Sequence, residues 1–129
     1  MNWTFYLILG LGLFFITCSS DSKQSSKLQS DGKVSLSLFD QKLKKTDAPQ
    51  LVDVRTPEEF AKGHVDGAKN INFNAADFDN QITQLDKTKP VFIYCHSGGR
   101  SGKAYKKMKA NGFTTVYDME GGYSAYSKK

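Results

Sequence analysis

The chain has 129 residues, of which 39% are hydrophobic and 24% charged, and this composition predicts one globular domain with one modest core. The formal net charge of +5 favours anionic partners. No dense basic block with interleaved aromatic residues occurs, so nucleic-acid binding is not expected.

The first 17 residues are typical of a signal peptide. Residues 2–17 carry no charged side chain and are too few for a comfortable membrane span of about 20 residues. They lead to Cys18 and Ser19, an order that resembles the signal of a bacterial lipoprotein, in which the cysteine is lipidated and becomes the mature N-terminus. A cleaved secretory signal and an uncleaved anchor remain as alternatives.

The lipoprotein interpretation predicts an exported protein, held by its N-terminal lipid on the periplasmic side of a bacterial membrane. Ser19 is not the acidic residue that often marks inner-membrane retention, which favours the outer membrane. Residues 18–33 contain six serines and one large apolar side chain, and such a segment cannot bury enough surface to fold. We expect it to be a tether to a domain that spans residues 34–129.

Within that domain, short apolar runs alternate with amphipathic stretches. Strands are expected at 50–54, 70–73, 91–95 and 114–119. The first helix has apolar residues at Leu36, Phe39 and Leu43, with Ser37 three residues before Asp40 at its start. Alternation of strands and helices predicts an α/β fold with a mostly parallel sheet.

The remaining helices show clear start and stop signals. Thr56 precedes Pro57, Glu58 and Glu59, which is an N-cap followed by a proline and a glutamate at the positions that helices favour, and Gly63 can end this helix. Asn74 is expected to cap the next helix, with an apolar stripe at Phe78, Ile82 and Leu85. The last clear helix is expected to start near Ser101, to bury Ala104, Tyr105 and Met108, and to stop at Gly112.

Cys95 lies at the junction between an apolar strand and a glycine-rich loop, "CHSGGRS". Parallel sheets bind ligands at the carboxyl ends of their strands. The loop's glycines permit the backbone angles at which N–H groups point inward at a sulfur, and the start of the next helix and Arg100 add positive charge. If Cys18 is lipidated, Cys95 has no intramolecular partner for a disulfide. Cys95 is therefore a candidate nucleophile, and an inert buried cysteine is the alternative.

Three blocks in order resemble a single-domain rhodanese. They are "LVDVRTPEEFAKGHVDGAKNI" (51–71), "VFIYCHSGGRSGKA" (91–104) and "GFTTVYDMEGGYSAY" (112–126), and together they cover almost everything from residue 34 onward. The resemblance implies a three-layer domain with a central, mostly parallel five-stranded sheet flanked by helices. It also implies a sulfurtransferase that carries sulfur on Cys95 as a persulfide.

The same resemblance implies the roles of the site residues. The substrate-binding loop consists of His96, Ser97, Gly98, Gly99, Arg100 and Ser101. The donor is a small sulfur compound such as thiosulfate, and the acceptor is a thiol or cyanide. No metal and no organic cofactor are implied, and the oligomeric state is left open. His96 stands where the thiosulfate enzymes of the family carry an arginine, so the physiological donor is also left open.

Three further residues are expected to support the loop: Asp53 and Arg55 through a buried ion pair, and His64 through a hydrogen bond to a turn beneath it. His96 is either a contact for the sulfur donor or a solvent-exposed loop residue.

Two other functions remain as alternatives to a sulfurtransferase. A non-catalytic rhodanese-like binding module is one. A cysteine phosphatase or arsenate reductase is the other, although those enzymes have one residue more than the four that separate Cys95 from Arg100.

Overall fold

A five-stranded parallel sheet forms the centre of the fold. The computed structural model describes residues 31–129. The strands follow the order β1-β5-β4-β2-β3, and all four pairings are parallel. The strands are β1 (Gly32–Val34), β2 (Gln50–Asp53), β3 (Lys69–Asn70), β4 (Val91–Tyr94) and β5 (Val116–Met119). The predicted α/β fold with a parallel five-stranded sheet is confirmed.

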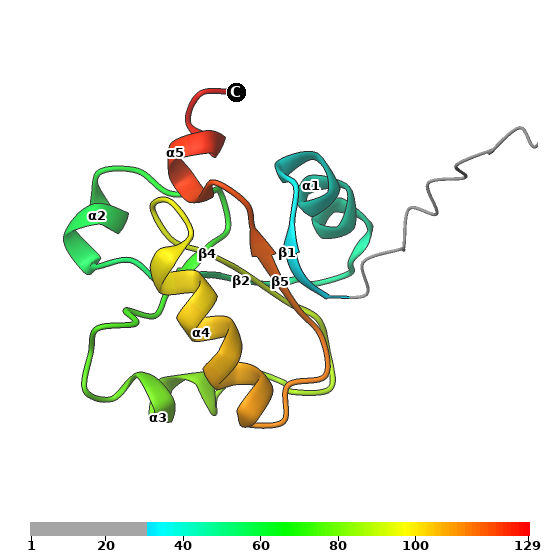
Figure 1. Cartoon of the computed structure of the whole chain (residues 1–129), viewed down its shortest axis with the longest axis vertical. Helices are drawn as coiled ribbons and strands as arrows, with labels where there is room; N and C mark the ends of the chain where they lie inside the picture. Colours follow the sequence, from blue (N-terminus) through cyan, green and yellow to red (C-terminus); the bar gives the residue numbers. More distant parts are fainter. Residues whose placement is uncertain (1–30) are drawn as a thin grey trace, which may run out of the picture.

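Helices cover both faces of this sheet and give the fold its three layers (Figure 1). On one face, α3 and α4 pack with alternate strand residues into one hydrophobic cluster, and on the other face α1 and α5 do the same. The helices are α1 (Leu36–Lys45), α2 (Pro57–Ala61), α3 (Phe78–Ile82), α4 (Gly99–Ala110) and α5 (Gly122–Tyr126). Because β4 and β5 lie inside the sheet and are covered on both faces, every residue of both strands is buried.

The predicted start of α2 is confirmed. Thr56 is the N-cap, its hydroxyl accepts from the Glu59 N–H, and the Glu59 side chain accepts from the Thr56 N–H, which completes a capping box. Pro57 occupies the first turn. Gly63 follows the C-cap residue Lys62 with a φ of +150°, so the helix ends where the sequence predicts.

Three predicted boundaries are wrong. Helix α1 is capped by Ser35, not Ser37, because the Ser35 hydroxyl accepts from the N–H of Leu38, which leaves Ser37 inside the first turn. Helix α3 begins at Phe78 after Asp77, since the residues that follow Asn74 form turns. Helix α4 begins at Gly99, two residues before Ser101, and buries Ala104 and Met108 while Tyr105 stays half-buried.

The sheet also differs from the predicted strands at its two edges. β3 is only the pair Lys69–Asn70, not the predicted 70–73. The chain continues alongside β2, because the N–H groups of Ile71 and Phe73 still donate to the carbonyl oxygens of Asp53 and Val54. β1 pairs with β5 and includes Gly32 and Lys33, which sequence analysis assigned to the tether. The predicted signal peptide (1–17) and the predicted lipid attachment site at Cys18 lie outside the described residues. Within residues 31–129, no helix has the length and apolar character needed to cross a membrane.

Candidate active site

The Cys95 side chain lies at the carboxyl end of β4, where the chain turns into the loop 96–98 and then into α4. The residue is 1% exposed. The backbone N–H of Gly98 donates a hydrogen bond to its sulfur at 3.0 Å. Gly98 has a φ of +116°, a backbone conformation that residues other than glycine rarely adopt. In this conformation its N–H points inward at the sulfur. The loop therefore places the N–H donor of Gly98 against the sulfur atom.

The electrostatics of the loop favour the thiolate. Burial opposes ionisation of Cys95, because desolvation disfavours the charged form. The hydroxyl of Ser101 and the N–H groups of Ser101, Gly98 and Ser97 outweigh burial and lower the pKa of the thiol below its ordinary value. A thiolate is the nucleophilic form of cysteine, so this placement makes Cys95 more reactive near neutral pH.

The N-terminus of α5 holds the same loop from its other side. The N–H groups of Tyr123 and Ser124 donate to the carbonyl oxygens of Cys95 and His96 at 2.8 and 2.9 Å. The approach requires glycine at position 122, which has a φ of +56°: a Cβ there would lie 2.5 Å from the Cys95 oxygen. Gly121 and Gly122 belong to the block 112–126 that carries the family resemblance, and no local pattern indicates their contact with the active loop.

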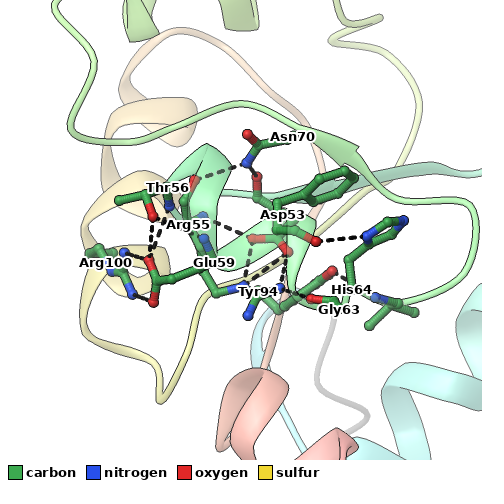
Figure 2. A network of polar contacts seen from close by, with 11 residues as sticks. Asp53, Arg55, Thr56, Glu59, Gly63, His64, Asn70, Tyr94 and Arg100 are labelled. Carbon is green, nitrogen blue, oxygen red and sulfur yellow. Dashed lines mark hydrogen bonds and ion pairs between the residues drawn. The ribbon is translucent and has the colours of Figure 1, made fainter.

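Arg100 lies on the rim of the loop but does not point a free charge at the sulfur. Its guanidinium donates two hydrogen bonds, of 2.6 and 2.8 Å, to the carboxylate of Glu59 (Figure 2). The bonds from Arg100 hold the pKa of Glu59 down at about 2, although burial opposes this shift. The sequence does not indicate this partner, because Glu59 already has a sufficient local role in the capping box.

Asp53 and Arg55 form the buried ion pair that the sequence predicts. The guanidinium of Arg55 contacts the carboxylate of Asp53 at 2.7–3.0 Å, and the side chains are 3% and 0% exposed. Arg55 also donates to the carbonyl of Gly63 at 2.6 Å and lies 4.3 Å over the ring of Tyr123. The pair therefore joins the end of β2 to the turn after α2 and to α5.

His64 is exposed and lies on the opposite side of this network from Arg100 (Figure 2). Its Nδ1 is 3.0 Å from the carbonyl oxygen of Phe60, and its ring stacks on the Phe60 ring at 3.7 Å. The contact of His64 is thus with the last turn of α2. The predicted hydrogen bond to a turn beneath the active loop is not among the contacts of His64 within residues 31–129, and a role of His64 in supporting that loop stays a prediction.

A cavity of about 310 Å³ opens beside His96. Two of its charged groups are already paired, Arg55 with Asp53 and Glu59 with Arg100. Lys62 belongs to no ion pair among residues 31–129, so the cavity wall carries an uncompensated positive charge that suits an anion. Its lining residues are Arg55, Glu59, Lys62, His96, Tyr123, Ser124 and Ser127.

Two charged residues behind the loop were missed by sequence analysis. The Nζ of Lys33 lies close to the loop, 3.6 Å from the place that a Cβ on Gly98 would take. Asp118, on β5, is 2% exposed and contributes to the surroundings of Ser101. A single acid inside the apolar run 116–119 was the available signal for Asp118, whereas Lys33 follows a Ser-rich segment and carries no signal.

Comparison with known proteins places the fold and the loop in a family. The model of the rhodanese-like domain matches residues 35–129. The uncharacterized protein YqhL of Bacillus subtilis is 38% identical over 80 residues, and this match covers 62% of each chain, which is less than two thirds of that relative. Thiosulfate sulfurtransferase 16 of Arabidopsis thaliana, a chloroplast protein, is 40% identical over 89 residues, 61% of this chain and 74% of that one.

A solved structure agrees with these sequence relatives. The rhodanese-like domain protein from Staphylococcus aureus superposes with a TM-score of 0.65 at 31% identity, over 73% of this chain and 89% of that one. The parallel sheet, the cysteine at the end of β4 and the three matching blocks thus have one explanation: the chain belongs to the rhodanese-like domain family.

Proposed function

We propose that this protein is a sulfurtransferase that moves a sulfane sulfur from a small donor to a thiophilic acceptor through a persulfide on Cys95. The observation that carries the proposal is the environment of the thiol: a pKa below its ordinary value, in a loop whose N–H groups face the sulfur. Relatives whose names include thiosulfate sulfurtransferase support the reaction class.

The reaction takes two steps. The Cys95 thiolate attacks the outer sulfur of a donor such as thiosulfate, the S–S bond of the donor breaks, and sulfite leaves with the bonding electrons. The outer sulfur of the resulting persulfide is then attacked by a thiolate or cyanide, and the Cys95 thiolate is the leaving group. Such covalent catalysis predicts ping-pong kinetics.

The loop supplies the electrostatic part of both steps. The persulfide has a negative outer sulfur, which N–H groups directed into the loop stabilise in the way that an oxyanion hole stabilises an alkoxide. The N–H of Gly98 already contacts the Cys95 sulfur at 3.0 Å. An anionic donor would meet Lys62 in the adjacent cavity, together with His96. Because Arg100 is neutralised by Glu59, we assign it mainly to shaping the loop.

The experiment is intact mass spectrometry of residues 31–129 after incubation with thiosulfate, followed by addition of cyanide. The expected result is a gain of one sulfur on the wild-type domain, which cyanide removes as thiocyanate, and no gain on Cys95→Ser. An aryl phosphate is assayed in parallel. Hydrolysis of the phosphate without sulfur transfer would identify a phosphatase. A domain inert to both reagents and to other sulfane donors would identify a binding module.

His96→Arg separates donor recognition from catalysis. The added guanidinium offers two parallel hydrogen bonds to the thiosulfate dianion, so KM for thiosulfate should fall. His96 lines the cavity, and its side chain is exposed. An unchanged KM would show that the side chain at position 96 does not contact the donor.

We also propose that the full chain is a lipoprotein anchored through Cys18 on the periplasmic side of a bacterial membrane. The basis is the charge-free segment before Cys18 and the Ser-rich segment after it. The expected result is that wild-type protein sediments with membranes and incorporates labelled fatty acid, whereas Cys18→Ser does not. Wild-type protein that remains unlabelled and retains Met1 would contradict the proposal.

A further inference from the structure

Asp118 is a buried acid with an incomplete set of partners. Its side chain lies in β5 and is 2% exposed, and within residues 31–129 its Oδ1 is buried without a hydrogen-bond partner. A buried carboxylate that lacks hydrogen bonds is costly, because it loses the hydration of a full charge. A protonated carboxyl group loses much less and can itself donate a hydrogen bond.

The sheet places Asp118 directly behind the active loop. In the parallel ladders it is opposite Ile93 of β4 and Lys33 of β1. Side chains alternate along a strand, so Asp118 lies on the same face as Val116, the face that α4 covers. The first turn of α4 contains Ser101, which is fully buried between this face and the Cys95 loop.

The hydroxyl of Ser101 acts on both Cys95 and Asp118. It is the largest of the contributions that lower the pKa of the thiol, and it also lowers that of the carboxyl. In the structure the hydroxyl is directed at the carbonyl oxygen of Gly98, at a long 3.3 Å. A serine hydroxyl has one proton, so it cannot donate fully to the thiolate, to a carboxylate and to this carbonyl at the same time.

Burial of Asp118 favours its neutral form. Burial raises the pKa of Asp118, and the opposing effects of Ser101 and of the Lys33 ammonium are smaller. Lys33, from β1, is exposed and forms no ion pair with Asp118. From β4, the neighbouring charge is the Cys95 thiolate itself. A second negative charge behind that thiolate would repel it and would also attract the proton of Ser101.

We infer that Asp118 is a positioning residue that stays protonated while Cys95 is a thiolate, donates its proton to the Ser101 oxygen, and so directs the Ser101 hydroxyl at the sulfur. The chain of donors runs from the Asp118 carboxyl through Ser101 to Cys95. The thiol proton is released to water, and Asp118 keeps its own. This inference rests on the proposed role of Cys95 as the nucleophile, but its test does not depend on sulfur transfer.

The test measures the rate of Cys95 alkylation by iodoacetamide against pH, which gives the thiolate pKa. Asp118→Asn keeps a permanent donor toward Ser101, so its thiolate pKa should equal the wild-type value or lie between that value and the Ser101→Ala value. Ser101→Ala should raise the pKa of the Cys95 thiol, because the thiolate loses its side-chain donor. Asp118→Ala should raise the thiolate pKa by less than Ser101→Ala does. The Ser101 hydroxyl is still present in this variant, but it has lost the partner that orients it. Glu120→Gln, an exposed acid two residues along the chain, is the control and should match wild type.

Infrared spectroscopy gives a second measurement that a purely structural role would not produce. Wild-type protein at neutral pH should show the carbonyl stretch of a protonated carboxyl, which Asp118→Asn removes and Glu120→Gln keeps. An ionised Asp118 predicts the opposite result: no such band, and a thiolate pKa that falls by about one unit or more in Asp118→Asn, as removal of an adjacent like charge would require. That outcome, or a Ser101→Ala pKa equal to wild type, would overturn the inference. If Asp118→Asn does not fold, the wild-type band and the Ser101→Ala pKa still decide it.

Discussion

The two flanks of the Cys95 loop are built differently. On the α2 flank, which we define as Asp53, Arg55, Glu59 and Arg100, each charge meets an opposite charge at 2.6–3.0 Å. On the β5 flank, which we define as Lys33, Ser101 and Asp118, the partners are incomplete: the buried Oδ1 of Asp118 has none among the described residues. A fully paired network fixes geometry, whereas a partly satisfied one leaves a proton that can take more than one position.

The contrast explains how one loop can be both rigid and reactive. The α2 flank and the N-terminus of α5 hold the backbone of the loop in place, through the Glu59–Arg100 pair and the two N–H groups that bind the carbonyls of Cys95 and His96. On the β5 flank, the Ser101 hydroxyl opposes the effect of burial and lowers the pKa of the Cys95 thiol, and we infer that Asp118 acts through it. Substitutions on the first flank should change stability most, and substitutions on the second should change the pKa of Cys95 most.

The largest effect is expected from Arg55→Ala. Asp53 is completely buried, so loss of its partner leaves an uncompensated charge, which costs about 3–5 kcal/mol of stability. Urea unfolding, monitored by circular dichroism, measures this loss of stability. Lys107→Ala is the control, because its pair with Asp79 is 47% and 62% exposed and should contribute about 1 kcal/mol or less. Equal losses in the two variants would contradict the structural role of the Asp53–Arg55 pair.

Gly122→Ala should break the support of the loop from α5. Alanine at this φ of +56° costs about 1–2 kcal/mol, and its Cβ would lie 2.5 Å from the Cys95 oxygen. The loop must shift, so the pKa of Cys95 should rise toward its ordinary value and sulfur transfer should fall strongly. Gly112→Ala is a matched control, with a φ of +90° and no atom within 4 Å of the added Cβ. Gly112→Ala should lose a similar amount of stability, because its backbone conformation is also unfavourable for alanine. It should leave the alkylation profile of Cys95 unchanged.

Local sequence patterns predicted those parts of the site that depend on neighbours in the chain. The strand, loop and helix around Cys95 follow from an apolar run, glycines and a helix start, and the capping box at Thr56 follows from four consecutive residues. The pairing of Arg55 with Asp53 was also predicted, since Arg55 follows Asp53, the last residue of β2, by only two positions.

What could not be predicted depends on contacts between distant segments. Arg100 meets Glu59 across 41 residues, and nothing in the local pattern of either residue indicates the other. β1 has three residues, and its place at the sheet edge is decided by pairing with β5 rather than by its own composition. The coupling of Asp118 to Ser101 likewise requires the order of the strands, which places β5 beside β4.

A smaller effect is expected for Glu59→Gln, measured as stability against pH. The pKa of Glu59 is about 2 in the folded protein and about 4.3 in an unfolded chain. Its lowered pKa therefore contributes stability above about pH 4.3, which is lost as the pH falls through about 2. Because both side chains are partly exposed, the difference from wild type at neutral pH should be about 1 kcal/mol or less, and it should vanish near pH 2. Glutamine keeps the capping box, so a difference that persists at pH 2 would have another origin.

The smallest effect is expected at His64, which contacts α2 and lies outside both flanks. His64→Phe keeps the stacking on the Phe60 ring and removes the hydrogen bond to the Phe60 carbonyl, whereas His64→Ala removes both. Since the side chain is exposed, the free energy of unfolding in urea should fall by about 0.5 kcal/mol or less in each variant. The alanine variant should be the less stable of the two. The alkylation profile of Cys95 should not change in either. A shifted thiolate pKa in both variants would place His64 in electrostatic contact with the loop and extend the α2 flank beyond Arg55.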